Sequence, residues 1–233
     1  MTLRPVASQF RFVFFFVLAS GVYGLDFSGA ELGFSVTPEY NRAFNQCWTF
    51  SGSGSLSFNE RYTVKSGLSF WAARDVYEVD TFISGEAVFP LRLPLSGGVS
   101  YVFNGMPDYD TGSHTLLPLI SLKGRRAGIS VGPALRFNSF YYTRTVFESI
   151  LAVSAYVNFY NTEKFRIGLR CANFGDFAVG NFGSYFLNLN SSLKLTKLFS
   201  LINELELYQS GSSGLSANFF GVAYRGGLTV SWR

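Results

Sequence analysis

Apolar and polar side chains alternate with a period of two along most of the chain. Near the end of the chain, for example, Tyr224 and Trp232 fall on one parity and Arg225 falls on the other. Successive side chains of a β-strand point to opposite faces, so this pattern predicts strands with one apolar and one polar face. The apolar face meets either a protein core or lipid, and the alternation by itself does not distinguish the two.

The alternation predicts twelve strands separated by turn residues. Their expected ranges are 25–36, 47–58, 62–72, 82–91, 94–104, 115–122, 127–138, 147–159, 165–173, 184–195, 198–208 and 219–232. Most have about 9–12 residues, the length with which a tilted strand crosses a bilayer. A sheet in lipid must close on itself, because unpaired backbone groups are costly there. We therefore predict an all-β, transmembrane, up-and-down antiparallel β-barrel of twelve strands, with ten or eight strands as alternatives.

The predicted connections alternate between short and long. The short ones lie at 59–61, 91–93, 123–126, 161–164 and 196–197, and the long ones at 37–46, 73–81, 105–114, 139–146, 174–183 and 209–218. The short turns are mostly basic, and the long loops are mostly acidic. Outer-membrane barrels combine short periplasmic turns with longer extracellular loops. This asymmetry predicts periplasmic termini and surface-exposed long loops.

The composition favours lipid as the partner of the apolar face. Hydrophobic residues make up 48% of the chain and charged residues only 15%, with 26 Phe and 24 Gly. A soluble domain usually carries about 25% charged residues. A secreted soluble barrel or sandwich with its apolar residues inside is the alternative. The modest net charge of +4, without a basic run, argues against a nucleic-acid partner.

The first 24 residues have the features of a secretory signal peptide. Arg4 and Arg11 precede an apolar run at 12–18, and small residues follow up to Gly24. This run is too short for a transmembrane helix. Cleavage after Gly24 would leave one domain, residues 25–233.

The mature chain resembles a bacterial outer-membrane β-barrel of the small, monomeric porin or channel type. The resemblance rests on the signal segment, the even number of strands, the two kinds of connection and aromatic residues near strand ends, such as Trp48, Tyr62 and Trp232. In size it is similar to nucleoside channels and to porins for acidic oligosaccharides. The resemblance implies insertion among outer-membrane lipids by a barrel-assembly machinery. The chain ends in Arg233 rather than in the usual aromatic residue.

If the apolar face meets lipid, the polar parity lines the interior. The charged candidates for a channel lining are Lys65, Glu86, Arg136, Glu148, Arg166, Arg170, Lys194, Glu204, Glu206 and Arg225. These side chains either border a narrow water-filled channel for small polar solutes or neutralise one another. Pairing of the arginines with Glu204 and Glu206 would satisfy charges that are costly when buried alone. No predicted loop is long enough to suggest an inward-folded plug.

Aromatic residues in the predicted outer loops are candidates for binding an extracellular ligand. They are Phe140, Tyr141, Tyr142, Phe174, Phe177 and Phe182. A non-conducting surface adhesin or structural barrel that acts through these loops is therefore one alternative function. An eight-stranded OmpW-like carrier of hydrophobic solutes is another.

We expect no enzyme activity, cofactor or metal site. His114 is the only histidine, and it lies in a predicted loop directly beside Ser113. In outer-membrane phospholipases one residue separates the His and the Ser on a strand, and an Asn follows. One histidine and two distant cysteines do not form a zinc site. The predicted strands do not place Cys47 next to Cys171, although an exported chain could form this disulfide.

Overall fold

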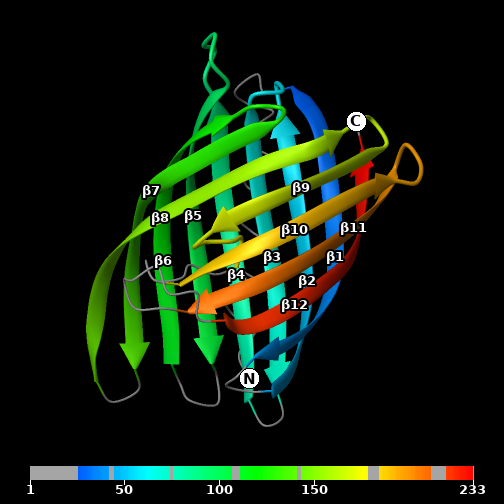
Figure 1. Cartoon of the computed structure of the whole chain (residues 1–233). Coiled ribbons are helices and arrows are strands. Elements are labelled where there is room, and N and C mark those ends of the chain that lie inside the picture. The colour runs from blue at the N-terminus through cyan, green and yellow to red at the C-terminus, as the bar shows by residue number, and fades with distance from the viewer. Residues whose placement is uncertain are drawn as a thin grey trace.

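The structure is a computed structural model that describes residues 26–41, 45–73, 76–106, 111–140, 143–177, 184–210 and 219–232. The predicted signal peptide lies outside these residues. Twelve antiparallel strands form one closed barrel, in which neighbours in sequence pair and β1 pairs with β12 (Figure 1). The predicted fold is therefore confirmed, and the alternatives of ten and eight strands are wrong. Among the described residues, no helix is long and apolar enough to cross a membrane.

The strand bounds agree with the predicted ranges best at the rim of the short turns. The strands are β1 (Phe27–Asn41), β2 (Asn45–Phe58), β3 (Tyr62–Ala73), β4 (Val76–Val88), β5 (Leu95–Met106), β6 (Thr111–Lys123), β7 (Ala127–Phe140), β8 (Thr143–Asn161), β9 (Phe165–Ala172), β10 (Ser184–Lys194), β11 (Phe199–Ser210) and β12 (Phe219–Trp232). At the opposite rim most strands run several residues beyond their predicted ends.

The predicted strict alternation of short and long connections is wrong, because the strands extend into several of the predicted long loops. Several predicted long loops shrink to the intervals 42–44, 74–75, 107–110 and 141–142, and only 173–183 and 211–218 are long. Glu39, Glu78 and Asp80 fall within the predicted long loops 37–46 and 73–81, but they lie on strands and line the interior. Acidic residues at these positions indicate a polar lumen rather than an external loop.

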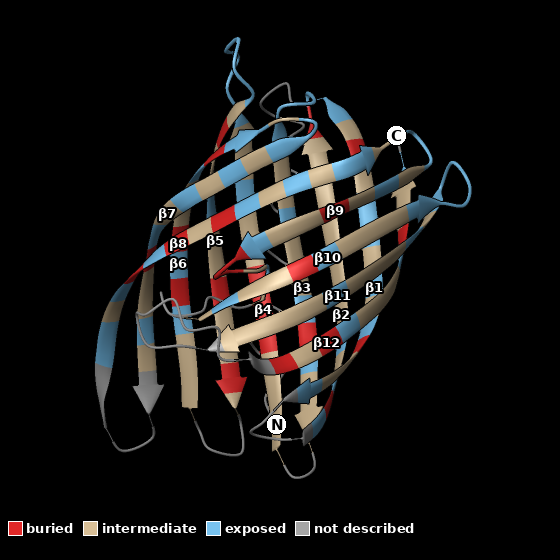
Figure 2. Ribbon diagram, viewed as in Figure 1, coloured by how far each residue is buried: buried red, intermediate tan, exposed pale blue. Residues whose placement is uncertain are grey.

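The outer face of the barrel is apolar and exposed. Tyr224 and Trp232 on β12 are exposed, whereas Arg225 between them points inward to Glu204. Phe34 on β1 is 62% exposed, and exposed positions recur along the strands around the barrel (Figure 2). A soluble protein buries such a surface, whereas lipid covers it in an outer-membrane barrel. The arrangement is the reverse of a soluble barrel with an apolar interior.

The wall is uneven where β8 meets β9. β8 has 19 residues and β9 only 8, and the last residue of β9 pairs with Ser154, well short of the start of β8 (Figure 1). Beyond β9, Asn173 takes the place of the missing strand. Its side-chain oxygen accepts the Val153 N–H at 2.7 Å, its side-chain nitrogen donates to the Leu151 carbonyl at 2.8 Å, and its own N–H donates to the Val153 carbonyl at 3.1 Å. Asn173 thereby satisfies the exposed edge of β8 at the point where the chain leaves the sheet.

Replacing Asn173 by Ala should destabilise the folded barrel. The substitution leaves the Val153 N–H and the Leu151 carbonyl without these partners, and a buried unsatisfied group costs about 1–3 kcal/mol. Urea unfolding of protein refolded in lipid vesicles, followed by heat-modifiable gel mobility, measures the loss. Asn161→Ala is the control, because it removes one hydrogen bond to the Arg125 carbonyl at an exposed turn. Equal stability of Asn173→Ala and the wild type would contradict this role of Asn173.

Candidate functional site

The barrel encloses a cavity of about 880 Å³ that is lined by residues of every strand. Most of the charged residues predicted for the interior line it, namely Lys65, Glu86, Arg166, Arg170, Glu204, Glu206 and Arg225. The other predicted residues lie apart from this cavity. Arg136 and Glu148 face each other at 3.7 Å on β7 and β8, and Lys194 is exposed at the end of β10.

The cavity carries both signs of charge in nearly equal numbers. Its acidic residues are Glu39, Glu78, Asp80, Glu86, Asp176, Glu204 and Glu206. Its basic residues are Lys65, Lys123, Arg125, Arg166, Arg170 and Arg225. Because the two sets nearly cancel, the lumen as a whole has little net attraction for a highly charged polymer.

The two signs are distributed unequally along the barrel axis. Glu39, Glu78 and Asp80 lie near the ends of β1 and β4 that border the intervals 42–44 and 74–75. Lys123 and Arg166 lie at the opposite rim, at the end of β6 and the start of β9. A solute that passes from one rim to the other therefore meets first one sign of charge and then the other.

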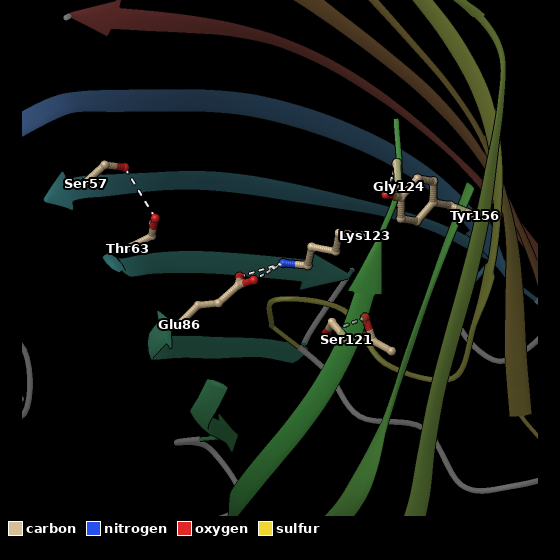
Figure 3. A network of polar contacts seen from close by, with 8 residues as sticks. Ser57, Thr63, Glu86, Ser121, Lys123, Gly124 and Tyr156 are labelled. Carbon is tan, nitrogen blue, oxygen red and sulfur yellow. Dashed lines mark hydrogen bonds and ion pairs between the residues drawn. The ribbon is translucent and has the colours of Figure 1, made fainter. Parts of the chain in front are cut away.

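Polar contacts join strands and a turn at the rim that carries Lys123 (Figure 3). The Lys123 ammonium lies 2.5 Å from the Glu86 carboxylate, which links β6 to β4 across β5. The Tyr156 hydroxyl donates to the Gly124 carbonyl at 2.8 Å. Lys123 was predicted to lie in a turn, but it is the last residue of β6 and shares its parity with Ser121. That parity was the available signal that Lys123 faces inward.

Residues 173–177 enter the barrel. Phe174 is only 7% exposed and packs on an apolar patch formed by Leu117, Ala134, Ile150 and Ala152 on the inner faces of β6, β7 and β8. The prediction that no loop folds inward is therefore wrong, and so is the placement of Phe174 on an external loop. The remaining aromatic loop candidates Tyr141, Tyr142 and Phe182, and the side chain of Phe140, lie outside the described residues.

Arg170 on β9 holds the beginning of this segment. Its guanidinium donates to the Phe174 carbonyl and to the Ser154 hydroxyl, both at 2.9 Å. The guanidinium carbon also lies 5.6 Å and 5.5 Å from the ring centroids of Phe174 and Phe186, within the range of cation–π attraction. Arg170 is thus engaged with the crossing segment and does not form the ion pair with Glu204 or Glu206 that was considered for it.

Phe177 anchors the other end of the described segment on β4 and β5. Its ring meets that of Phe82 on β4 edge to face, with centroids 4.9 Å apart. Asn104 on β5 donates to the Phe177 carbonyl at 2.6 Å and to Asp80 at 2.7 Å. Gly67 on β3 leaves room for the rings, because a Cβ there would lie 2.5 Å from the Phe82 ring and 3.0 Å from that of Phe177. Residues 173–177 therefore cross the lumen, which also corrects the external placement of Phe177.

One interpretation of the sequence pairs the inner arginines with Glu204 or Glu206. Among these ion pairs, the structure has the one between Arg225 and Glu204, at 3.0 Å. Glu204 and Glu206 also accept hydrogen bonds from Asn188. Part of the inner charge is thus neutralised within the barrel, as expected if the inner charges pair with one another. Lys65 and Arg166, by contrast, take part in none of the ion pairs among the described residues.

The only histidine and the two cysteines lie apart from one another. His114 lies on β6 rather than in a loop, is exposed, and has its Nδ1 2.6 Å from the Tyr101 hydroxyl. Ser113 pairs with the inward-facing Asn104, so Ser113 and His114 point to opposite faces. Cys47 on β2 and Cys171 on β9 are not joined by a disulfide. No group of three or more His, Cys, Asp or Glu side chains in the described part of the chain could hold a metal ion.

A closed antiparallel barrel with an apolar outer face and a charged lumen defines a β-barrel of the outer-membrane type. Among solved structures, the chain is similar to the KdgM porin in complex with disordered oligogalacturonate, with a TM-score of 0.58 and 10% identity over 87% of this chain and 99% of that one. It is similar to the NanC porin with a TM-score of 0.58 and 8% identity, over 84% and 98% of the two chains.

The same fold also occurs in an enzyme. Outer membrane phospholipase A from Escherichia coli gives a TM-score of 0.51 and 10% identity, over 88% of this chain and 98% of that one. At these identities the likeness concerns the fold. No protein-family model and no curated protein matches the sequence.

Proposed function

We propose that the chain is an outer-membrane channel of the porin type, which passes small polar solutes through a lumen narrowed by residues 173–177. The observation that carries this proposal is the cavity of about 880 Å³, lined by polar and charged side chains of all twelve strands. Side chains can fill an eight-stranded barrel, whereas a barrel with more strands has a wider interior. The KdgM and NanC porins share this fold, which supports a channel.

The proposal includes a place and an orientation. The exposed apolar face would contact outer-membrane lipids, and the domain 25–233 would insert as a monomer through a barrel-assembly machinery after removal of the signal peptide. The basic turns near Arg61, Arg125 and Lys164 would then face the periplasm, together with both termini. The alternative of an adhesin loses support from two of its aromatic candidates, because Phe174 and Phe177 point into the barrel.

Residues 25–233, refolded and inserted into a planar lipid bilayer, should produce discrete conductance steps. The steps are expected because charged and hydroxyl side chains around the cavity can replace part of the hydration shell of a solute. Heat-modifiable gel mobility establishes beforehand that the barrel is folded. A folded protein that leaves the bilayer silent at several salt concentrations would overturn the channel.

Loosening the crossing segment should widen the channel. Arg170→Ser removes the donor to the Phe174 carbonyl, and Phe177→Ala removes the ring that packs on Phe82. Both variants should therefore show larger conductance steps than the wild type in the same bilayer. Lys194→Ser is the matched control, since Lys194 does not line the cavity, and it should leave the step size unchanged. Unchanged steps in both loosened variants would show that residues 173–177 do not limit the flow.

A further inference from the structure

We propose that this channel selects small zwitterions, and that Lys65 and Asp176 recognise the carboxylate or sulfonate end and the ammonium end of the solute. This inference rests on the proposed channel function and names the class of its solutes.

Lys65 and Asp176 face the same space from different elements. Both line the large cavity and also a second cavity of about 200 Å³ beside it. Lys65 belongs to the wall, where it lies in register with Ser55 on β2 and Ser84 on β4. Asp176 is exposed and belongs to the crossing segment, between the anchors Phe174 and Phe177. The space between wall and segment is therefore bordered by one cation of the wall and one anion of the segment, in addition to Arg225, Glu204 and Glu31.

Neither Lys65 nor Asp176 forms an ion pair among the described residues. The ion pairs there are Lys123 with Glu86, Arg136 with Glu148, and Arg225 with Glu204, so that neither Lys65 nor Asp176 takes part. Glu86 also attracts Lys65, but Lys123 holds its carboxylate at 2.5 Å. Lys65 and Asp176 are thus free to interact with a solute.

The other charges at the smaller cavity already have partners: Arg225 pairs with Glu204 at 3.0 Å, and Glu31 accepts a hydrogen bond from the Ser231 hydroxyl. The rest of the surface is rich in hydroxyl groups. The smaller cavity is bordered by Ser35, Ser51, Ser53, Ser55 and Thr229, together with the rings of Phe82 and Phe177. Hydroxyl groups can donate to a carboxylate and accept from an ammonium group, so they favour neither sign. The volume suits a solute of a few carbon atoms rather than a polymer.

Simple electrostatics then separates the solute classes. An anion is attracted by Lys65 but repelled by Asp176. A cation is attracted by Asp176 but repelled by Lys65. A solute that carries both charges at its two ends interacts favourably with both residues. Discrimination comes as much from the repelled charge as from the attracted one.

The test measures flux into vesicles that contain refolded residues 25–233. The three probes share a two-carbon skeleton. Taurine carries both charges, isethionate carries only a negative charge, and ethanolammonium carries only a positive charge. The wild type should pass taurine several-fold faster than the other two. Lys65→Gln should shift the preference toward ethanolammonium, and Asp176→Asn should shift it toward isethionate.

A charge exchange provides the sharpest comparison. The double variant Lys65→Asp with Asp176→Lys keeps one charge of each sign and should regain the preference for taurine. Lys194→Gln, outside the cavity, should behave as the wild type. Conducting vesicles in which all three probes pass at equal rates, or in which the single variants change nothing, would overturn the zwitterion selectivity and leave the channel standing. Folded protein that passes none of the probes would overturn the channel and the selectivity together.

Discussion

The pairing of β1 with β12 is the constraint on which the rest of the molecule depends. In lipid, a strand edge has no water to hydrogen-bond, so a sheet there is stable only when its first and last strands meet. Closure then determines what each parity faces: one set of side chains contacts lipid and the other lines an enclosed space. The charged interior follows from closure, because the residues that cannot face lipid have no other place to go.

The same constraint explains the crossing segment. β9 stops while β8 continues, which exposes backbone groups of β8 to the apolar surroundings. Asn173 satisfies the Val153 N–H and the Leu151 carbonyl with a side-chain amide, which imitates one further residue of a strand. Because the amide takes over this role, the main chain is free to turn inward. A requirement of the lipid-facing wall thus directs residues 173–177 into the lumen.

The alternation of side chains was sufficient to predict the strands and their two faces, and the composition then indicated that the polar face, with residues such as Arg225 and Glu204, points inward. The alternation did not predict the places where the inner face of the barrel is apolar. Leu117, Ile150 and Phe82 face inward although they are apolar, and they form the surfaces on which Phe174 and Phe177 pack. Such a contact joins residues far apart in sequence, and no local pattern marks it. Glu78 and Asp80 were misassigned for a related reason, since polarity alone does not separate a lumen wall from a loop.

The crossing segment also changes what the lumen can distinguish. The segment carries Asp176 off the wall, so that Asp176 borders the same two cavities as Lys65 of β3. Most other charges are held by neighbours, as Glu86 is by Lys123 and Glu204 by Arg225, and serve the structure of the wall. Selectivity then depends on the few charges that the fold leaves unpaired, and their positions follow from where β9 ends.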